Sequence, residues 1–166
     1  MNKKYVMLIA CFVGIALVFT FIIAIATRGN RSNTPADVVS GEATLEAGEG
    51  NYTIKITTVL EAEPKPTKDD APKAQRVAIV VYEYTNDDIA HGLAIGNTHF
   101  KAYDMSGKEL EQYPQKDLFE PSEVGVSGTF TASVAFALNN KNDYLKIEYY
   151  NDTESKKPDA VFEQEW

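Results

Sequence analysis

The residues of this chain that could ligate a metal ion lie within one short stretch, NDDIAHGLAIGNTH. It holds the two histidines of the chain, His91 and His99, preceded by Asp87 and Asp88. The spacings match no established zinc or calcium ligand pattern. Glycines and turn-forming aspartates indicate a loop. We therefore predict no metal site and no cofactor, with these four residues as the candidates to examine in a structure.

Catalytic groups are also missing from the polar part of the sequence. The single cysteine, Cys11, lies in an apolar run, and no Gly-x-Ser-x-Gly motif occurs. Neighbouring acids such as Asp69 and Asp70 lie in the proline-rich, charged segment 61–73, which lacks the apolar surroundings that raise a carboxyl pKa. We predict that the protein is not an enzyme.

Two adjacent tyrosines, Tyr149 and Tyr150, suggest a binding role instead. Successive side chains of a strand point to opposite faces of its sheet. We therefore expect one of these two rings to face outward, where it could contact a partner or a glycan. Tyr149 and Tyr150 are the candidate partner-binding residues.

The charge of the chain limits the class of partner. Of its 166 residues, 14 basic and 24 acidic ones follow Thr27, which gives that part a net charge of −10. Nucleic acid and anionic lipid are bound through clustered Lys and Arg. We therefore predict no binding to nucleic acid.

The amino-terminal segment Tyr5 to Thr27 has no charged residue and is long enough, as a helix, to cross a bilayer core of roughly 30 Å. We predict a single-pass anchor at 5–27, a cytoplasmic tail at 1–4 and a linker at 28–40. A cleaved signal, cut after Ala26, and a lipidated Cys11 remain alternatives. All three place residues 41–166 outside the membrane, and cleavage would give a secreted protein.

The remainder is patterned as β-strands with turn signals between them. In YTIKITTVL, one face would carry Tyr52, Ile54, Ile56, Thr58 and Leu60 toward the core. The proline-rich segment 61–73 is interpreted as a mobile connection. Strands are expected at Ala43 to Ala47, Tyr52 to Leu60, Arg76 to Asn86, Thr98 to Asp104, Lys108 to Tyr113, Gly128 to Leu138, Asp143 to Tyr150 and Val161 to Trp166. The fold class is therefore all-β, an immunoglobulin-like antiparallel sandwich of about seven or eight strands.

Four runs carry a family resemblance: RVAIVVYEYTNDD, FKAYDMSGKEL, EVGVSGTFTASVAFAL and YLKIEYY. Over roughly residues 50 to 150, the chain resembles immunoglobulin-like domains of unknown function on exported lipoproteins and membrane-anchored proteins of Gram-positive bacteria. The resemblance implies an extracytoplasmic β-sandwich and lends no catalytic residues.

These observations predict a membrane-anchored, surface-exposed, non-enzymatic binding or accessory module. Its partner would be an envelope protein, a wall polymer or a host ligand. A sensor or carrier of a metal ion or small ligand is the alternative function. An exposed apolar or aromatic patch on one sheet would favour the binding module.

Overall fold

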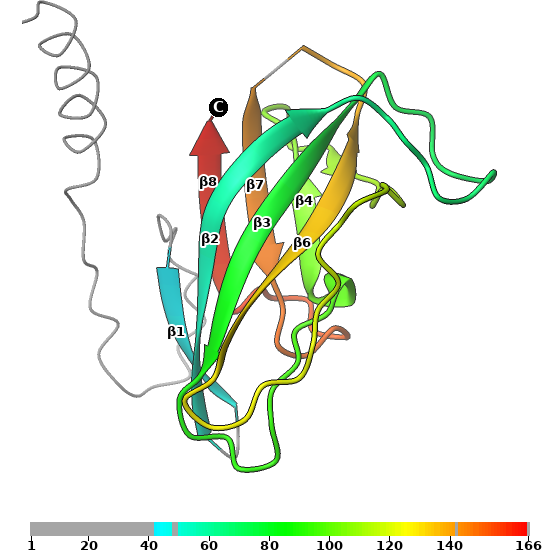
Figure 1. Ribbon diagram of the computed structural model, residues 1–166. Helices are drawn as coiled ribbons and strands as arrows, with labels where there is room; N and C mark the ends of the chain where they lie inside the picture. Colours follow the sequence, from blue (N-terminus) through cyan, green and yellow to red (C-terminus); the bar gives the residue numbers. More distant parts are fainter. Residues whose placement is uncertain (1–41, 48–49, 142, 166) are drawn as a thin grey trace, which may run out of the picture. The chain divides into compact units, whose positions relative to one another are not determined.

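The computed structural model describes residues 42–47, 50–141 and 143–165, which form eight strands in two antiparallel sheets (Figure 1). Sheet 1 has the order β1-β2-β3-β6 and sheet 2 the order β5-β4-β7-β8. The strands are β1 Glu42–Ala47, β2 Gly50–Ala62, β3 Arg76–Asn86, β4 Phe100–Tyr103, β5 Glu109–Leu110, β6 Thr129–Leu138, β7 Tyr144–Tyr149 and β8 Ala160–Glu165, with a 3-10 turn, η1, at Asn97–His99.

The predicted β-sandwich is confirmed. Every strand that the sequence predicts is present, with bounds shifted by a few residues. The described residues include no helix long and apolar enough to span a membrane. The predicted tail 1–4, anchor 5–27 and linker 28–40, with Cys11 and Ala26, lie outside the described residues.

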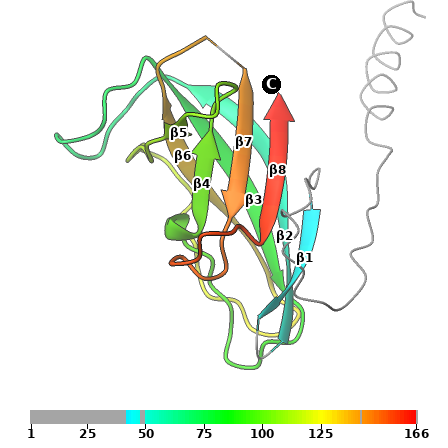
Figure 2. The same ribbon diagram turned by 180° about the vertical axis from the view of Figure 1, so that it is seen from behind.

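The main core lies between the two sheets, which Figures 1 and 2 show from opposite sides. Strand alternation supplies it: on β6, Ala132, Val134, Phe136 and Leu138 face inward as predicted. The largest fully buried rings are those of Tyr52, Tyr82, Tyr84, Phe100, Phe136, Tyr149 and Phe162. Burial of many apolar side chains stabilises this disulfide-free domain.

A β-bulge in β2 overturns one predicted face. Ile56 pairs with Tyr82 of β3, but the next paired residue of β2 is Thr58, opposite Val81, so Thr57 is an extra residue. An extra residue reverses the alternation that follows it. Val59 therefore enters the core, and Leu60, predicted to be inside, is 50% exposed on the outer face of sheet 1.

The chain passes from one sheet to the other along residues 109–113, which we call the crossing segment. Leu110 pairs with Ala102 in sheet 2. Three residues later, Tyr113 donates its backbone N–H to Ala135 of β6 at 2.8 Å. The crossing segment therefore closes one side of the sandwich and covers the free edge of β6.

A second, smaller cluster lies on the outer face of sheet 1. Val77, Ala135 and Ala137 are buried there with Tyr113. Ala71 of the proline-rich segment and Ala74, which follows it, pack against this cluster. The earlier part of that segment pairs with residues 114–116: Thr67 donates to the Pro114 carbonyl at 2.7 Å, and Lys116 to the Lys65 carbonyl at 2.9 Å. The segment 61–73, predicted to be a mobile connection, is therefore hydrogen-bonded to residues 114–116.

Candidate functional site

The two candidate aspartates join β3 to the start of β2. Asp88 accepts hydrogen bonds from the backbone and the side-chain nitrogen of Asn51. Asp87 accepts one from the Thr53 hydroxyl at 3.2 Å. Both carboxylates therefore stabilise the loop that leaves β3, a role typical of turn aspartates.

The two candidate histidines lie in the chain between these aspartates and β4. His99, at the end of η1, places Nδ1 2.7 Å from the Tyr150 carbonyl oxygen and stacks on Tyr149 with 5.8 Å between ring centroids. His91 is exposed in the preceding loop. Throughout the part of the chain that the structure describes, no three His, Cys, Asp or Glu residues are grouped as metal ligands.

Tyr150 faces outward from sheet 2, as strand alternation predicts, but neither ring is exposed. Tyr149 lies in the core, where its hydroxyl is 3.0 Å from that of Tyr52. Tyr150 lies outside the main core cluster but is only 5% exposed, because Lys101 lies 5.1 Å from its ring centroid. Alternation keeps the two rings apart, but the cover comes from β4, a strand distant in sequence.

On the outer face of sheet 2, Tyr150 belongs to a hydrogen-bonded group around Glu148. Its hydroxyl donates to Glu148 at 2.6 Å, and the Lys146 ammonium is 2.7 Å from the same carboxylate. Burial alone would raise the pKa of Glu148, but the hydrogen bonds from Lys146 and Tyr150 outweigh it and lower this pKa. These contacts join neighbouring residues along one side of β7 and keep the Glu148 carboxylate paired.

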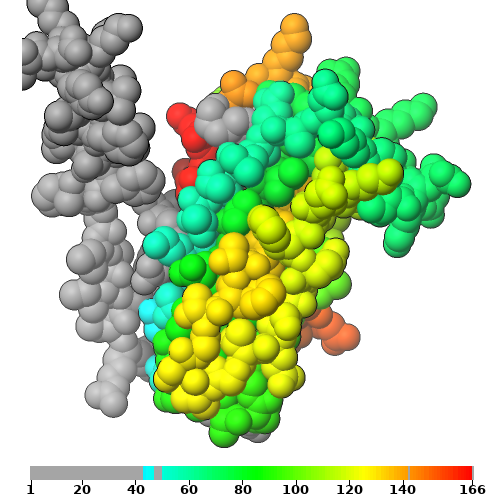
Figure 3. All heavy atoms as spheres, viewed as in Figure 1, coloured from blue at the N-terminus to red at the C-terminus, as the bar shows by residue number. Residues whose placement is uncertain are grey.

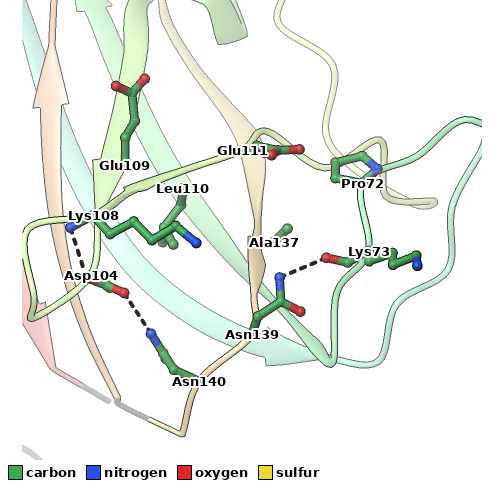
Figure 4. Close-up of a pocket in the computed structure, with 10 residues that line it drawn as sticks. All are labelled: Pro72, Lys73, Asp104, Lys108, Glu109, Leu110, Glu111, Ala137, Asn139 and Asn140. Atoms are coloured by element: carbon green, nitrogen blue, oxygen red, sulfur yellow. Dashed lines mark hydrogen bonds between the residues drawn. The ribbon is translucent and has the colours of Figure 1, made fainter.

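A polar cavity of about 330 Å³ lies beside the crossing segment (Figure 4). Asp104 forms part of its wall and is held there by four hydrogen bonds. Its Oδ1 accepts from the backbone N–H and hydroxyl of Ser106 and from the Lys108 N–H, and its Oδ2 accepts from Asn140. The Ser106 hydroxyl is the main cause of the lowered pKa of Asp104. The lining also carries Lys73, Lys108, Glu109 and Glu111, so it offers charges of both signs.

A second cavity, of about 480 Å³, lies next to the first and shares Glu109, Leu110 and Glu111 with it. Phe100, Phe136 and Gln112 line its other walls. The Gln112 amide is already used, donating to the carbonyls of Asn97 and Phe100. The lining residues of the two cavities include neither serine, cysteine nor histidine.

Sheet 1 presents the apolar surface that the sequence could not locate. Leu60 pairs with Ile79, which in turn pairs with Ala135, so the three lie side by side across the outer face. Phe119, 61% exposed, is fixed to β6 by two hydrogen bonds with Ser133, in the adjacent row. We call Leu60, Ile79, Leu118 and Phe119 the sheet 1 patch.

Figure 3 views this face. The chain 111–127, yellow-green to yellow, lies over much of it, and part of β3, green, remains visible between that chain and β2. The patch residues come from β2, β3 and a loop, so no periodicity connects them. One available signal was the apolar pair Leu118 and Phe119 between charged residues and prolines.

Comparison with known proteins identifies the fold. No protein-family model and no curated protein sequence matches the chain. The match with the secreted protein MPT63 of Mycobacterium tuberculosis covers 80% of this chain and 100% of MPT63, with a TM-score of 0.61 and 11% identity. The Bacillus subtilis protein ycdA, described as a candidate lipoprotein, matches 76% of this chain, with a TM-score of 0.58 and 15% identity.

This chain spans only 39% of the length of ycdA. At such low identities the two likenesses support the β-sandwich fold alone. The family membership inferred from the sequence stays a prediction.

Proposed function

We propose that this chain is an exported, membrane-anchored binding module without enzymatic activity, built on an immunoglobulin-type sandwich. Such sandwiches pair strands A, B and E in one sheet and C, F and G in the other. The observed strand orders support this assignment with β2, β3 and β6 as A, B and E, and with β4, β7 and β8 as C, F and G. β5 then adds to the edge of the second sheet, and β1 adds beside β2.

The proposed export rests on the apolar run Tyr5 to Thr27, preceded by Lys3 and Lys4. The resemblance to exported domains of Gram-positive bacteria supports the same location. The mass of the mature amino terminus tests the anchor: an intact terminus is expected, whereas a chain beginning at residue 27 would show cleavage after Ala26.

The sheet 1 patch is the observation that carries the binding function. Leu60 and Phe119 expose half or more of their surface on one face, next to Ile79 and Leu118. Exposed apolar groups gathered in one place mark interaction surfaces more often than scattered ones do. The charged groups of sheet 2, by contrast, bond to one another around Glu148.

Photo-crosslinking in intact cells tests this function. A photoreactive amino acid is placed at Leu60 or Phe119, and for comparison at Met105 or Val126, which are 61% and 52% exposed elsewhere in the domain. The same discrete product is expected from both patch positions and from neither comparison position. Equal products from all four positions, or none from the patch, would refute the proposed surface.

The cavities at the crossing segment favour a second candidate function, the carriage of a small ligand. Lys73 and Lys108 line the first cavity together with Glu109 and Glu111 (Figure 4), a mixture of charges suited to a zwitterion. Titration calorimetry with free amino acids, and with Ca²⁺ and Zn²⁺ for the His91 and His99 loop, tests it. Heat of binding that disappears in Lys108→Met would support the carrier, and no heat with any of these probes would exclude it.

A further inference from the structure

Half of β2 lacks a neighbouring strand on one side. β1 pairs with β2 only from Gly50 to Lys55, and β3 occupies the other side along the whole strand. Within the described residues, no backbone hydrogen bond or bridge reaches residues 56–62 from the side of β1. An unpaired edge presents a row of N–H and C=O groups that can bind another strand.

The bulge gives this edge its apolar side chain. If β2 alternated regularly through Thr57, Leu60 would face the core; because Thr57 is an extra, unpaired residue, Leu60 projects onto the outer face against Ile79. Thr58 to Ala62 then follow regular pairing with β3, so five residues are available for a new strand on the other side. A strand added here would place every second side chain on the outer face of sheet 1, next to Leu60.

The charges near this edge decide which occupant fits. β8 contacts β2, and the two strands run beside each other in both ribbon views. Its carboxylates Glu163 and Glu165 alternate with the core residue Phe162 and therefore lie on the outer face of sheet 2. The acids at the end of the β2 edge are Glu61 and Asp143, which share the cation Arg76, and the part of the chain after Thr27 has a net charge of −10. A second copy would bring like charges together, whereas a basic segment would be attracted.

We propose that a basic, extended segment of a partner protein adds as a strand to the edge of β2 at residues 58–62. Its main-chain groups hydrogen-bond to β2, an apolar side chain packs on Leu60, and its Lys or Arg residues face Glu61 and Asp143. This inference rests on the proposed binding function and names the chemistry of its partner. It belongs to the strand-addition mode of peptide recognition.

Hydrogen exchange on the full-length chain in detergent micelles tests the inference. The probe is a seven-residue peptide of alternating lysine and valine, added in excess. The expected result is at least tenfold slower exchange in residues 56–62. A peptide with glutamate in place of lysine, and one with N-methylated backbone, should leave exchange unchanged, since the first reverses the charge and the second lacks the N–H donors.

Variants separate this site from general binding. Leu60→Lys should abolish the slowed exchange, and Met105→Lys, at an equally exposed apolar position, should retain it. Slowing at other segments, or equal slowing with the glutamate peptide, would overturn the inference. Slow exchange without peptide would also overturn the inference. If it depends on protein concentration, a second copy of the chain occupies the edge of β2; if it is lost on deleting residues 28–41, that segment of the same chain occupies the edge.

The failure of this inference is distinguishable from failure of the proposed function. Crosslinks from Phe119 require a partner on the sheet 1 patch but no added strand. Crosslinks with unchanged exchange would leave the binding module in place and remove only the strand addition.

Discussion

Removing one hydroxyl from the buried Tyr52 and Tyr149 pair should lower the unfolding free energy of the domain. Removing both hydroxyls should lower it by about the same amount or by less. The two oxygens are 3.0 Å apart, and both side chains are almost completely buried. Their rings also meet edge to face, with centroids 6.3 Å apart. Tyr→Phe substitution keeps those ring contacts, so the variants isolate the hydroxyl pair.

The magnitude follows from the unpaired group. In Tyr149→Phe, the hydroxyl of Tyr52 loses its partner in a dry core, which costs about 1–3 kcal/mol of unfolding free energy. The same cost is expected for Tyr52→Phe. In the double variant no unpaired hydroxyl remains, so its destabilisation should be about equal to or smaller than that of either single variant.

Urea unfolding of residues 32–166, which contain both sheets, is followed by circular dichroism and measures these energies. With a slope of ~2 kcal/mol per M, a loss of about 2 kcal/mol lowers the midpoint by about 1 M. Tyr144→Phe, at a partly exposed ring, is the control and should change the free energy by less than ~0.5 kcal/mol. A double variant destabilised by the sum of the singles would refute the pairing.

Burial also raises the pKa of Tyr52 to about 12. Its neutral hydroxyl therefore contributes stability that is fully present below pH ~10, the ordinary pKa of tyrosine, and is lost between pH ~10 and the folded pKa. The wild-type chain should lose stability over this range more steeply than Tyr52→Phe. Parallel curves for the two proteins would contradict the buried position of this hydroxyl.

Three further variants test other parts of the structure. Asp104→Asn should cost about 1–3 kcal/mol at pH 7, because this carboxylate accepts four hydrogen bonds. Since the pKa of Asp104 is lowered, that stability is present above pH ~4 and lost as pH falls. The thermal unfolding curves of variant and wild type should therefore converge near pH 2. A difference in unfolding temperature that stays constant with pH would contradict this prediction. Phe119→Ser should change the unfolding free energy by less than ~0.5 kcal/mol and abolish the crosslinked product formed from position 60. Val126→Ser should change neither the unfolding free energy nor that product. Deleting Thr57 should preserve the circular dichroism spectrum and cooperative unfolding, because only the bulge residue goes, whereas deleting Lys55 reverses the faces of the residues before it and should unfold the domain.

The strands and most of their faces could be predicted from the sequence. In Thr129 to Leu138, strict alternation assigns Phe136 and Leu138 to the core, and both are buried there. Turn formers between Asp104 and Gly107 correctly end β4 before β5. These features depend on neighbours in the chain, so a local pattern is sufficient to predict them.

The candidate site could not be predicted in the same way. The ammonium of Lys101, a residue of another strand, lies over the ring of Tyr150, and the metal candidates Asp87, Asp88 and His99 bond to partners that are distant in the sequence. In both cases the deciding contact joins segments far apart in sequence. The spacing of residues within one segment cannot predict such a contact.

The sequence by itself determined an acidic, disulfide-free, β-rich domain behind a long apolar segment, because composition and period-two patterning are local properties. Tertiary structure alone decided which surface is open. The register of β2 against β3 introduces the bulge that exposes Leu60, and the crossing segment covers β6 while the edge of β2 stays unpaired in the described chain. Strand register arises from pairing between separate segments, and only the folded chain contains it.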